Sequence, residues 1–393
     1  MTLDLIALVS AGALALLGLW PFGPYQLTLL AARALFGPRS VRPPFRPEVG
    51  APATFALCVC AHNEEAVIEQ KIRNLLDIKE TAGGGVEILI YCDGCTDRTV
   101  EIARRFEPDV KVFVSEERRG KIYGMNVLAD AAASAVLVFT DADIVADREL
   151  VRVLRRYFGD PQVGCVDVPL KHTNPDATPT TEVGTTYFRF EGWTKQLESD
   201  TGSLIGSTGG CYALRRDLYR RLSPGLCDDL HVSMSVLVQG FRVVRASGVH
   251  SYEAHPTLAE EEFRRRVRQT TQALHSHRVL WPELRRLGAW NLYKYFSHRL
   301  LRWFSGWCLL IASLLVLVVA CRTFGPAPVV LTVTGGAAAF ASARALRVKL
   351  ADRLWSALVA LAGTSFGVIM GLRGHRAVTW EGARSSRRAV LPP

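Results

Sequence analysis

The stretch TFALCVCAHNEE, residues 54–65, decides the fold class of this chain. Its first part, Thr54–Ala61, is a short apolar run, typical of a strand buried on both faces of a parallel sheet. The polar residues His62–Glu65 follow at once, and apolar residues then recur at helical spacing. The pattern predicts a buried strand, a polar turn and a helix, with Asn63 as the helix N-cap.

The same unit recurs further along the chain. Strands are expected at Val86–Tyr91, Val110–Val114 and Ala135–Thr140, and helices at Thr99–Phe106 and Lys121–Ala133. This alternation is typical of an α/β protein with a doubly wound, mostly parallel sheet. Right-handed crossovers place the strands in the order 3-2-1-4, so the first and fourth strands lie side by side. The loops at their carboxyl ends then form the crevice in which such sheets bind ligands.

Acidic side chains follow three of these strands and are expected to converge at that crevice. Glu64 and Glu65 follow the first strand, Asp93 the second, and Asp141 and Asp143 the fourth. A dinucleotide would need a glycine-rich turn for its pyrophosphate, and carboxylates occupy the turn here. A divalent cation must therefore hold any phosphate. Two carboxylates at one strand end suit Mg²⁺ or Mn²⁺ bridging a nucleotide diphosphate, although aspartates at strand ends also serve simply to close turns.

Apolar segments outside this region approach the roughly 20 residues that a membrane-spanning helix needs. They are Leu3–Leu17, Trp303–Ala320, Pro328–Ala343 and Leu354–Leu372. We therefore divide the chain into an anchor with a basic juxtamembrane segment (1–46), an α/β domain (47–285), an interfacial segment (286–302), transmembrane helices (303–373) and a basic tail (374–393). The first segment lacks the basic start and cleavage site of a signal peptide.

The formal net charge of +10 resides largely beside the apolar segments. Positive flanks mark the cytosolic side, which predicts a multi-pass protein of the cell membrane with a cytosolic α/β domain. Three C-terminal crossings would place the basic tail outside, so either one segment does not cross fully or the tail is an exception. Because the basic residues follow the membrane edges, membrane lipids are expected partners and nucleic acid is not.

Six strings in sequence order resemble the family 2 glycosyltransferases with a GT-A fold. They are CAHNEEAVIEQKIRNLL, YCDGCTDRTVEIA, RRGKIYGMNVLADAA, VLVFTDADI, IGSTGGCYALRRDLY and CDDLHVSMSVLVQGFRV, within Cys60–Val243. The resemblance implies a Rossmann-like GT-A fold for 47–285. The C-terminal apolar segments are similar to those of the polysaccharide-synthase side of the family.

The resemblance implies a role for each donor-side residue. Asp93 would hydrogen-bond the uracil or ribose of a UDP-type donor, and Glu64 or Glu65 would lie near the same base pocket. Lys121 would contact the donor, and Asp141 would lie near its ribose.

The resemblance also implies the reacting groups. Asp143 would bind the metal, with Asp141 beside it. In the pair Asp228-Asp229, the second acid would be the general base that takes the acceptor hydroxyl proton, with inversion at the anomeric carbon. One of the two acids could equally cap the helix that follows.

The chain departs from the processive members of the family, which carry a Gln-x-x-Arg-Trp motif after the base. The corresponding stretch here, EEEFRRRVRQTTQALHSH, has no Arg-Trp pair. Arg265 and Arg268 in this stretch could meet the leaving diphosphate, or the run could be a basic helix facing the membrane. Trp193 could stack on an acceptor sugar or pack the domain on the membrane.

These observations predict a metal-dependent, inverting glycosyltransferase that uses a nucleotide-diphosphate sugar, with UDP as the expected nucleotide. The acceptor is expected to be a lipid-linked molecule or a glycan at the membrane. One alternative is a processive polysaccharide synthase. A further alternative is a non-catalytic membrane scaffold of the same fold, against which both acid pairs argue.

Overall fold

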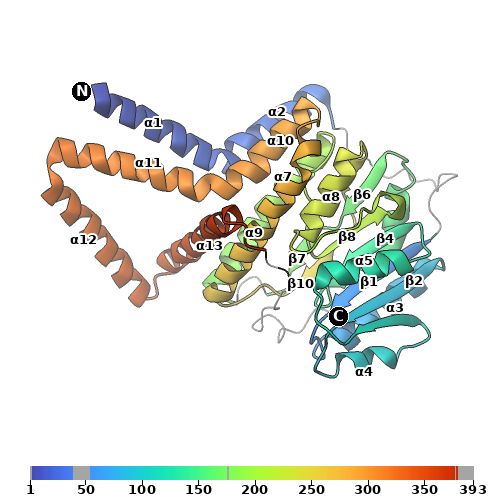
Figure 1. Ribbon diagram of the computed structural model, residues 1–393. Helices are drawn as coiled ribbons and strands as arrows, with labels where there is room; N and C mark the ends of the chain where they lie inside the picture. Colours follow the sequence, from blue (N-terminus) through green and yellow to red (C-terminus); the bar gives the residue numbers. More distant parts are fainter. Residues whose placement is uncertain (1, 39–53, 175–176, 377, 379–393) are drawn as a thin grey trace.

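The computed structural model describes residues 2–38, 54–174, 177–376 and 378. An α/β domain carries the central sheet, and long helices extend away from it (Figure 1). The predicted boundary between residues 46 and 47 and the basic tail beyond Val378 lie outside the described residues.

The large sheet of the described chain has seven strands in the order β3-β2-β1-β4-β8-β6-β9. Their bounds are β1 Phe55–Ala61, β2 Val86–Asp93, β3 Val110–Ser115, β4 Val136–Thr140, β6 Val163–Asp167, β8 Cys211–Arg215 and β9 Arg242–Arg245. β1 pairs in parallel with β2 and β4, whereas β8 is antiparallel to β4 and β6. The predicted strand order 3-2-1-4 and the mostly parallel α/β sheet are confirmed.

Both faces of the sheet are covered, which explains why β1 is apolar throughout. Phe55, Leu57 and Val59 pack in one core cluster, and Cys58 and Cys60 pack in the other. The first face is covered by α3 (Ile68–Ala82), α4 (Thr99–Arg104) and α6 (Leu150–Tyr157), and the second by α5 (Lys121–Ala131), α8 (Asp228–Val238) and α9 (Ala259–Leu284).

The predicted capping role of Asn63 is wrong. α3 begins at Ile68 with Val67 as its N-cap, and Asn63 lies in the loop before it with φ +53°. Asparagine tolerates this left-handed conformation better than most residues. Its Oδ1 accepts a hydrogen bond from the Thr96 backbone N–H at 2.8 Å, so Asn63 joins the loops after β1 and β2 instead.

A smaller sheet lies next to the carboxyl end of β4. Its strands are β5 (Val145–Ala146), β10 (Ser251–Glu253) and β7 (Leu170–His172), in the order β5-β10-β7. Between β7 and β8 runs the long helix α7 (Pro179–Asp200), which begins with a capping box at Thr178. These elements contribute side chains to the site described below.

Four helices of the described chain are long and apolar enough to cross a membrane. The N-terminal part comprises α1 (Thr2–Leu19), η1 (Trp20–Phe22) and α2 (Pro24–Phe36), and the C-terminal part comprises α10 (Ala289–Lys294), η3 (Tyr295–Leu300), α11 (Leu301–Phe324), α12 (Pro326–Ala345) and α13 (Lys349–Leu372). α1 lies along α11 so closely that a Cβ on Gly18 would come within 2.9 Å of Leu309 Cγ (Figure 1). The chain is therefore anchored in a membrane by apolar helices from both ends of the domain.

α13 returns to the α/β domain and lies along α9 (Figure 1). Gly363, Gly367 and Gly371 recur at every fourth position on the contacting face. A Cβ on Gly367 would lie 2.7 Å from Thr270 Cβ and 2.8 Å from the Val267 carbonyl oxygen. The glycines thus let the two helix backbones approach directly, as small residues do in closely packed helix pairs.

The residues after α13 contact loops of the α/β domain. A Cβ on Gly225 would lie 3.2 Å from Arg376 Cβ, and one on Gly120 would lie 2.8 Å from the Val378 carbonyl oxygen. The start of the tail therefore packs against the α/β domain.

Candidate active site

A cavity of about 1110 Å³ lies at the carboxyl ends of β1 and β4. Its walls come from α5, α7, α8 and α9 and from the membrane helices. Most of the predicted site residues line it, namely Glu64, Lys121, Asp141, Asp143, Asp228, Asp229, Arg265 and Arg268. Glu65 and Asp93 stand outside its lining.

Lys121 forms two short ion pairs that join the end of β4 to the start of α8. Its Nζ lies 2.7 Å from Asp141 Oδ1 and 2.8 Å from Asp228 Oδ2. Burial raises the pKa of Asp141 to about 6, with Lys121 opposing this shift and Asp143 and Asp228 adding to it. Burial lowers the pKa of Lys121, but the two carboxylates outweigh it and raise that pKa well above its usual value. Lys121 therefore remains charged between the two acids.

Asp93 fixes the loop that carries Lys121. The carboxylate is fully buried, and it accepts hydrogen bonds from the backbone N–H groups of Arg119 and Gly120, both at 2.8 Å. Both oxygens are thereby engaged at the start of α5. The direct contact of Asp93 with a donor nucleotide stays a prediction, whereas its positioning of Lys121 follows from these bonds.

Glu64 and Glu65 differ in their surroundings. Glu64 is 5% exposed and lines the cavity. Glu65 is exposed, its Oε2 accepts a hydrogen bond from the Arg98 N–H at 3.2 Å, and its own N–H donates to Asp97 Oδ2 at 3.0 Å. Glu65 thus ties the loop after β1 to the start of α4, and Glu64 is the better candidate for a donor contact.

Asp229 occupies the first turn of α8 and faces the cavity. The Cys227 thiol donates a hydrogen bond to its Oδ1 at 3.0 Å. A Cβ on Gly209 would lie 3.3 Å from its Oδ2, a tight contact, so this loop passes close to the carboxylate. Burial raises the pKa of Asp229, and the neighbouring carboxylate of Asp228 adds to the rise. Asp228 is neutralised by Lys121, whereas Asp229 has no ion pair within the described chain.

The loop 206–210 connects the two acid pairs. The Ser207 hydroxyl donates to the Asp229 carbonyl oxygen at 2.9 Å, and the Asp141 N–H donates to the Gly210 carbonyl oxygen at 3.2 Å. The Thr208 N–H donates to buried Asp167, and the Lys195 ammonium donates to the Thr208 hydroxyl at 2.8 Å. This loop was part of a string that carried the resemblance, IGSTGGCYALRRDLY, but none of its residues was assigned a role.

Glu253 was also missed by the sequence reasoning. It comes from β10 and lines the cavity on the side of Asp143. Burial raises its pKa to about 7, with Arg265 opposing this shift and the carboxylates of Asp143 and Asp141 adding to it. Strand β10 is short and far along the chain, so no local pattern indicated that it would add an acid here.

The acids fit a divalent cation that shares its ligands with a substrate. The Asp143 carboxylate makes no hydrogen bond or ion pair in the described chain, and carboxylates crowd around it. Among the residues described, no three His, Cys, Asp or Glu side chains form a complete metal cage. Mg²⁺ is commonly held by one or two carboxylates together with substrate phosphates. Asp143, with Asp141 beside it, is suited to that incomplete set.

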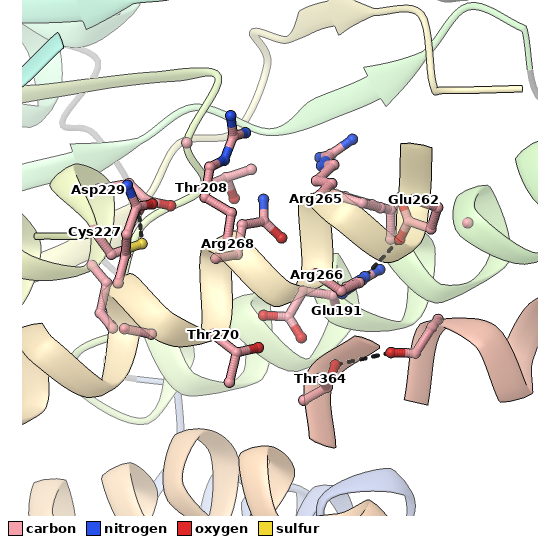
Figure 2. Close-up of a pocket in the computed structure, with 18 of the residues that line it drawn as sticks. Glu191, Thr208, Cys227, Asp229, Glu262, Arg265, Arg266, Arg268, Thr270 and Thr364 are labelled. Carbon is pink, nitrogen blue, oxygen red and sulfur yellow. Dashed lines mark hydrogen bonds and ion pairs between the residues drawn. The ribbon is translucent and has the colours of Figure 1, made fainter. Parts of the chain in front are cut away.

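The arginines of α9 divide into two groups. Arg264 and Arg266 pair with Glu260 and Glu262 of the preceding turn, each at 2.6 Å. Arg265 and Arg268 hydrogen-bond no carboxylate in the described chain. Figure 2 shows them extending from one side of α9, with Thr270 on the opposite side toward Thr364 of α13. Their predicted contact with a diphosphate stays a prediction.

Trp193 lies on an exposed face of α7. Its side chain is 44% exposed and packs beside Phe190, with ring centroids 5.9 Å apart. It is not part of the cavity lining. This position leaves the packing role open and offers no support for stacking on an acceptor.

Comparisons with known proteins agree with the fold. Residues 52–271 match the family described as "Glycosyltransferase like family 2". The solved mannosyltransferase PcManGT from Pyrobaculum calidifontis, in complex with GDP-Man and Mn²⁺, is 21% identical with a TM-score of 0.69, and the match covers 93% of this chain and 99% of that one. The uncharacterized glycosyltransferase YkcC of Bacillus subtilis (strain 168) is 28% identical over 100 residues, which are 25% of this chain and 31% of that protein. The match thus spans about a third of the curated relative.

Proposed function

The chain belongs to the glycosyltransferase-like family 2, and from this premise we propose that it is an inverting, metal-dependent glycosyltransferase. It would transfer a sugar from a nucleotide-diphosphate sugar to a lipid-linked or glycan acceptor at the membrane. The observation that carries the proposal is the convergence of Asp229 with Asp141 and Asp143 in one cavity, with Lys121 bridging Asp141 and Asp228.

Asp229 is the proposed general base. A base must reach the acceptor hydroxyl and must be ionised at the working pH with a pKa not far below it. The raised pKa and the missing cationic partner suit Asp229 to this task, whereas Asp228 is committed to Lys121. Asp229 would take the hydroxyl proton as the acceptor oxygen attacks the anomeric carbon and the bond to the diphosphate breaks on the opposite face.

The leaving diphosphate needs positive charge. Asp143, with Asp141, would hold Mg²⁺ or Mn²⁺, and the cation supplies charge stabilisation to the phosphate oxygens when bound. Arg265 and Arg268 project from α9 into the same cavity and would meet the remaining charge. PcManGT, which shares the fold, was solved with a nucleotide sugar and Mn²⁺, which supports a donor of this class.

The α/β domain is proposed to lie in the cytosol, anchored at the cell membrane. The support is the basic flanks of the apolar helices and the position of Arg376 and Val378 against the domain. Free nucleotide sugars in solution would then reach the cavity from the domain side. An acceptor would reach it from the membrane side, where helices line it.

The two alternative functions, a processive synthase and a non-catalytic scaffold, predict different reaction products. A processive synthase would form a ladder of products from one acceptor, whereas the absent Arg-Trp pair favours addition of single sugars. A scaffold would release no nucleoside diphosphate at all.

The test is release of nucleoside diphosphate by the full chain in lipid nanodiscs. A panel of UDP- and GDP-sugars is offered with Mn²⁺ or Mg²⁺ and membrane lipid extract, and product length is read by mass spectrometry. Release from one donor, lost with chelator and in Asp143→Asn and Asp229→Asn, is the expected result. Asp77→Asn, on the exposed face of α3, is the matched control. The proposal fails if every donor is left intact or if both site variants keep full activity.

A further inference from the structure

The cavity reaches well beyond the acid groups. One end holds Asp141, Asp143, Asp228 and Asp229, and the other extends between α7, α9 and the membrane helices. Its volume of about 1110 Å³ exceeds the roughly 300–1,000 Å³ of a typical small-molecule pocket. The space therefore suits a donor together with a second, elongated molecule.

The far end of the cavity is apolar. It is lined by Leu19, Phe22, Trp303, Leu309 and Leu361, which come from α1, η1, α11 and α13. Leu19 is 51% exposed and Phe22 is 39% exposed although both line the cavity, so this end is open rather than sealed. Since α1 and α11 are apolar enough to span a membrane, the opening faces hydrocarbon. A glycan would gain nothing from this lining, whereas a lipid chain would.

Two buried cations outside α9, Arg302 and Lys195, also line the cavity. Arg302 of α11 is 9% exposed, and its Nη1 donates to the Tyr187 hydroxyl at 3.0 Å and to Glu191. Its Nε and Nη2 are buried and have no hydrogen-bond partner among the described residues. Leaving a charged donor unsatisfied costs more than a neutral one, so an acceptor supplied by a ligand would stabilise this arrangement.

Lys195 of α7 is the second cation. It is 3% exposed, and its ammonium donates a hydrogen bond to the Thr208 hydroxyl, with no carboxylate in hydrogen-bonding contact in the described chain. It is close enough to Asp229 to influence the charge of that acid. Lys195 therefore lies within electrostatic reach of both Asp229 and Glu191, the partner of Arg302.

These cations are distinct from those on the donor side. Arg268 lies close enough to Asp228 and Asp141 to interact with them electrostatically, and Arg265 interacts in the same way with Glu253. The guanidinium of Arg302 instead lies 5.7 Å from the ring centroid of Phe22, at the membrane end. A donor diphosphate would occupy the first pair, which leaves Arg302 and Lys195 for another anion.

We propose that the acceptor is a phosphate-bearing lipid with a hydroxyl-bearing head: its phosphate lies between Arg302 and Lys195, its hydrocarbon leaves between α1, α11 and α13, and its hydroxyl faces Asp229. This inference rests on the proposed glycosyl transfer and specifies its acceptor. The phosphate serves for binding and takes no part in bond formation, since the hydroxyl oxygen forms the new glycosidic bond and Asp229 receives its proton.

The test measures binding without a donor, on the full chain in phosphatidylcholine nanodiscs. Three probes separate the parts of the ligand: phosphatidylinositol, soluble inositol phosphate without a chain, and an alkyl glucoside without a phosphate. Native mass spectrometry should show saturable binding of phosphatidylinositol, with the other two weaker by on the order of tenfold or more. Equal binding of the glucoside would overturn the phosphate site, and equal binding of inositol phosphate would overturn the lipid.

Variants locate the site. Arg302→Gln and Lys195→Gln should each weaken phosphatidylinositol binding by on the order of tenfold, and Arg302→Lys should recover part of it. Because Arg302→Gln removes one of the cationic partners of buried Glu191, which also contacts His298 and Arg299, Glu191→Gln with Arg302→Gln is made as well and its folding is checked by thermal unfolding. Arg322→Gln, an exposed arginine on the same helix that pairs with Asp4, is the control.

Unchanged binding in the folded variants would refute the assignment. Nucleoside diphosphate release is measured in parallel. If binding behaves as expected and no donor is turned over, the glycosyl transfer is wrong. If a donor is turned over with an uncharged acceptor and phosphatidylinositol does not bind, the lipid inference is wrong.

Discussion

Replacing Asp229 by asparagine removes the proposed base and little else. The Cys227 thiol, which lies 3.0 Å from the native Asp229 Oδ1, can still donate a hydrogen bond to the asparagine oxygen. The backbone carbonyl oxygen of this residue keeps its hydrogen bonds from the Ser207 and Ser233 hydroxyls at 2.9 and 2.6 Å. A general base contributes roughly 10²–10⁴-fold to rate. We therefore expect kcat to fall by that factor, which is about 2.7–5.4 kcal/mol on the barrier. The donor KM should stay within about threefold, since Asp229 is outside the Lys121 ion pairs.

The pH profile gives an independent reading of the same group. Burial and the Asp228 carboxylate raise the pKa of Asp229. The active form is the carboxylate, so kcat/KM should fall as the pH drops through that raised pKa. The acid limb should lie above the usual aspartate value of about 4. The residual activity of Asp229→Asn should lack this limb.

The assay is nucleoside diphosphate release with product detection, at saturating donor and across pH. Asp228→Asn is the comparison, because it removes the negative charge from the 2.8 Å ion pair with Lys121 and should act mainly on donor KM and stability. The reasoning is refuted if Asp229→Asn keeps its kcat and its acid limb while Asp228→Asn loses both.

The remaining predictions concern the ion pairs, the helix contact and the metal. Lys121→Met should cost about 1–3 kcal/mol of stability because two half-buried carboxylates lose their shared cation, and adding Asp228→Asn should recover part of the Tm; an unchanged Tm in the single variant would contradict the ion-pair account. Gly367→Leu should lower stability by about 1–3 kcal/mol by forcing α13 away from α9, while Gly335→Leu on α12, with open space around it, should not. Chelator should abolish activity, and Asp143→Asn should raise the Mn²⁺ concentration needed for half-maximal rate; a metal requirement equal to wild type would exclude Asp143 as a ligand.

The central sheet could be predicted because its strands carry a strong local signal. Runs such as Val136–Thr140 are apolar on both faces, and each ends in polar residues. Parallel connection rules then bring Asp141 and Lys121 to the same edge. Asp228 reaches this pair from α8, which lies much further along the chain. Only the family resemblance predicted that Asp228 would lie at this edge of the sheet.

The rest of the site depends on contacts between distant elements, which no local pattern encodes. Glu253 arrives on a strand of three residues. Lys195 lies on α7 and Arg302 on the membrane helix α11. In the sequence each is an isolated basic residue, which resembles an ordinary charge at the protein surface or at the membrane edge. Asn63 was misassigned because its side chain suits both a cap and a left-handed loop, and only its partner Thr96 decides between them.

The packing of α13 on α9 bears on how the protein is made. α13 supplies Ala357, Ala360 and Leu361 to the cavity wall, and Val378 beyond it closes against Gly120 beside Lys121. The ribosome releases these parts only after α11 and α12 have emerged and can enter the membrane. A nascent chain with a finished sheet still lacks one wall of its cavity. The wall of the cavity is thus completed last in synthesis, after both apolar helices that directly precede α13 have been made.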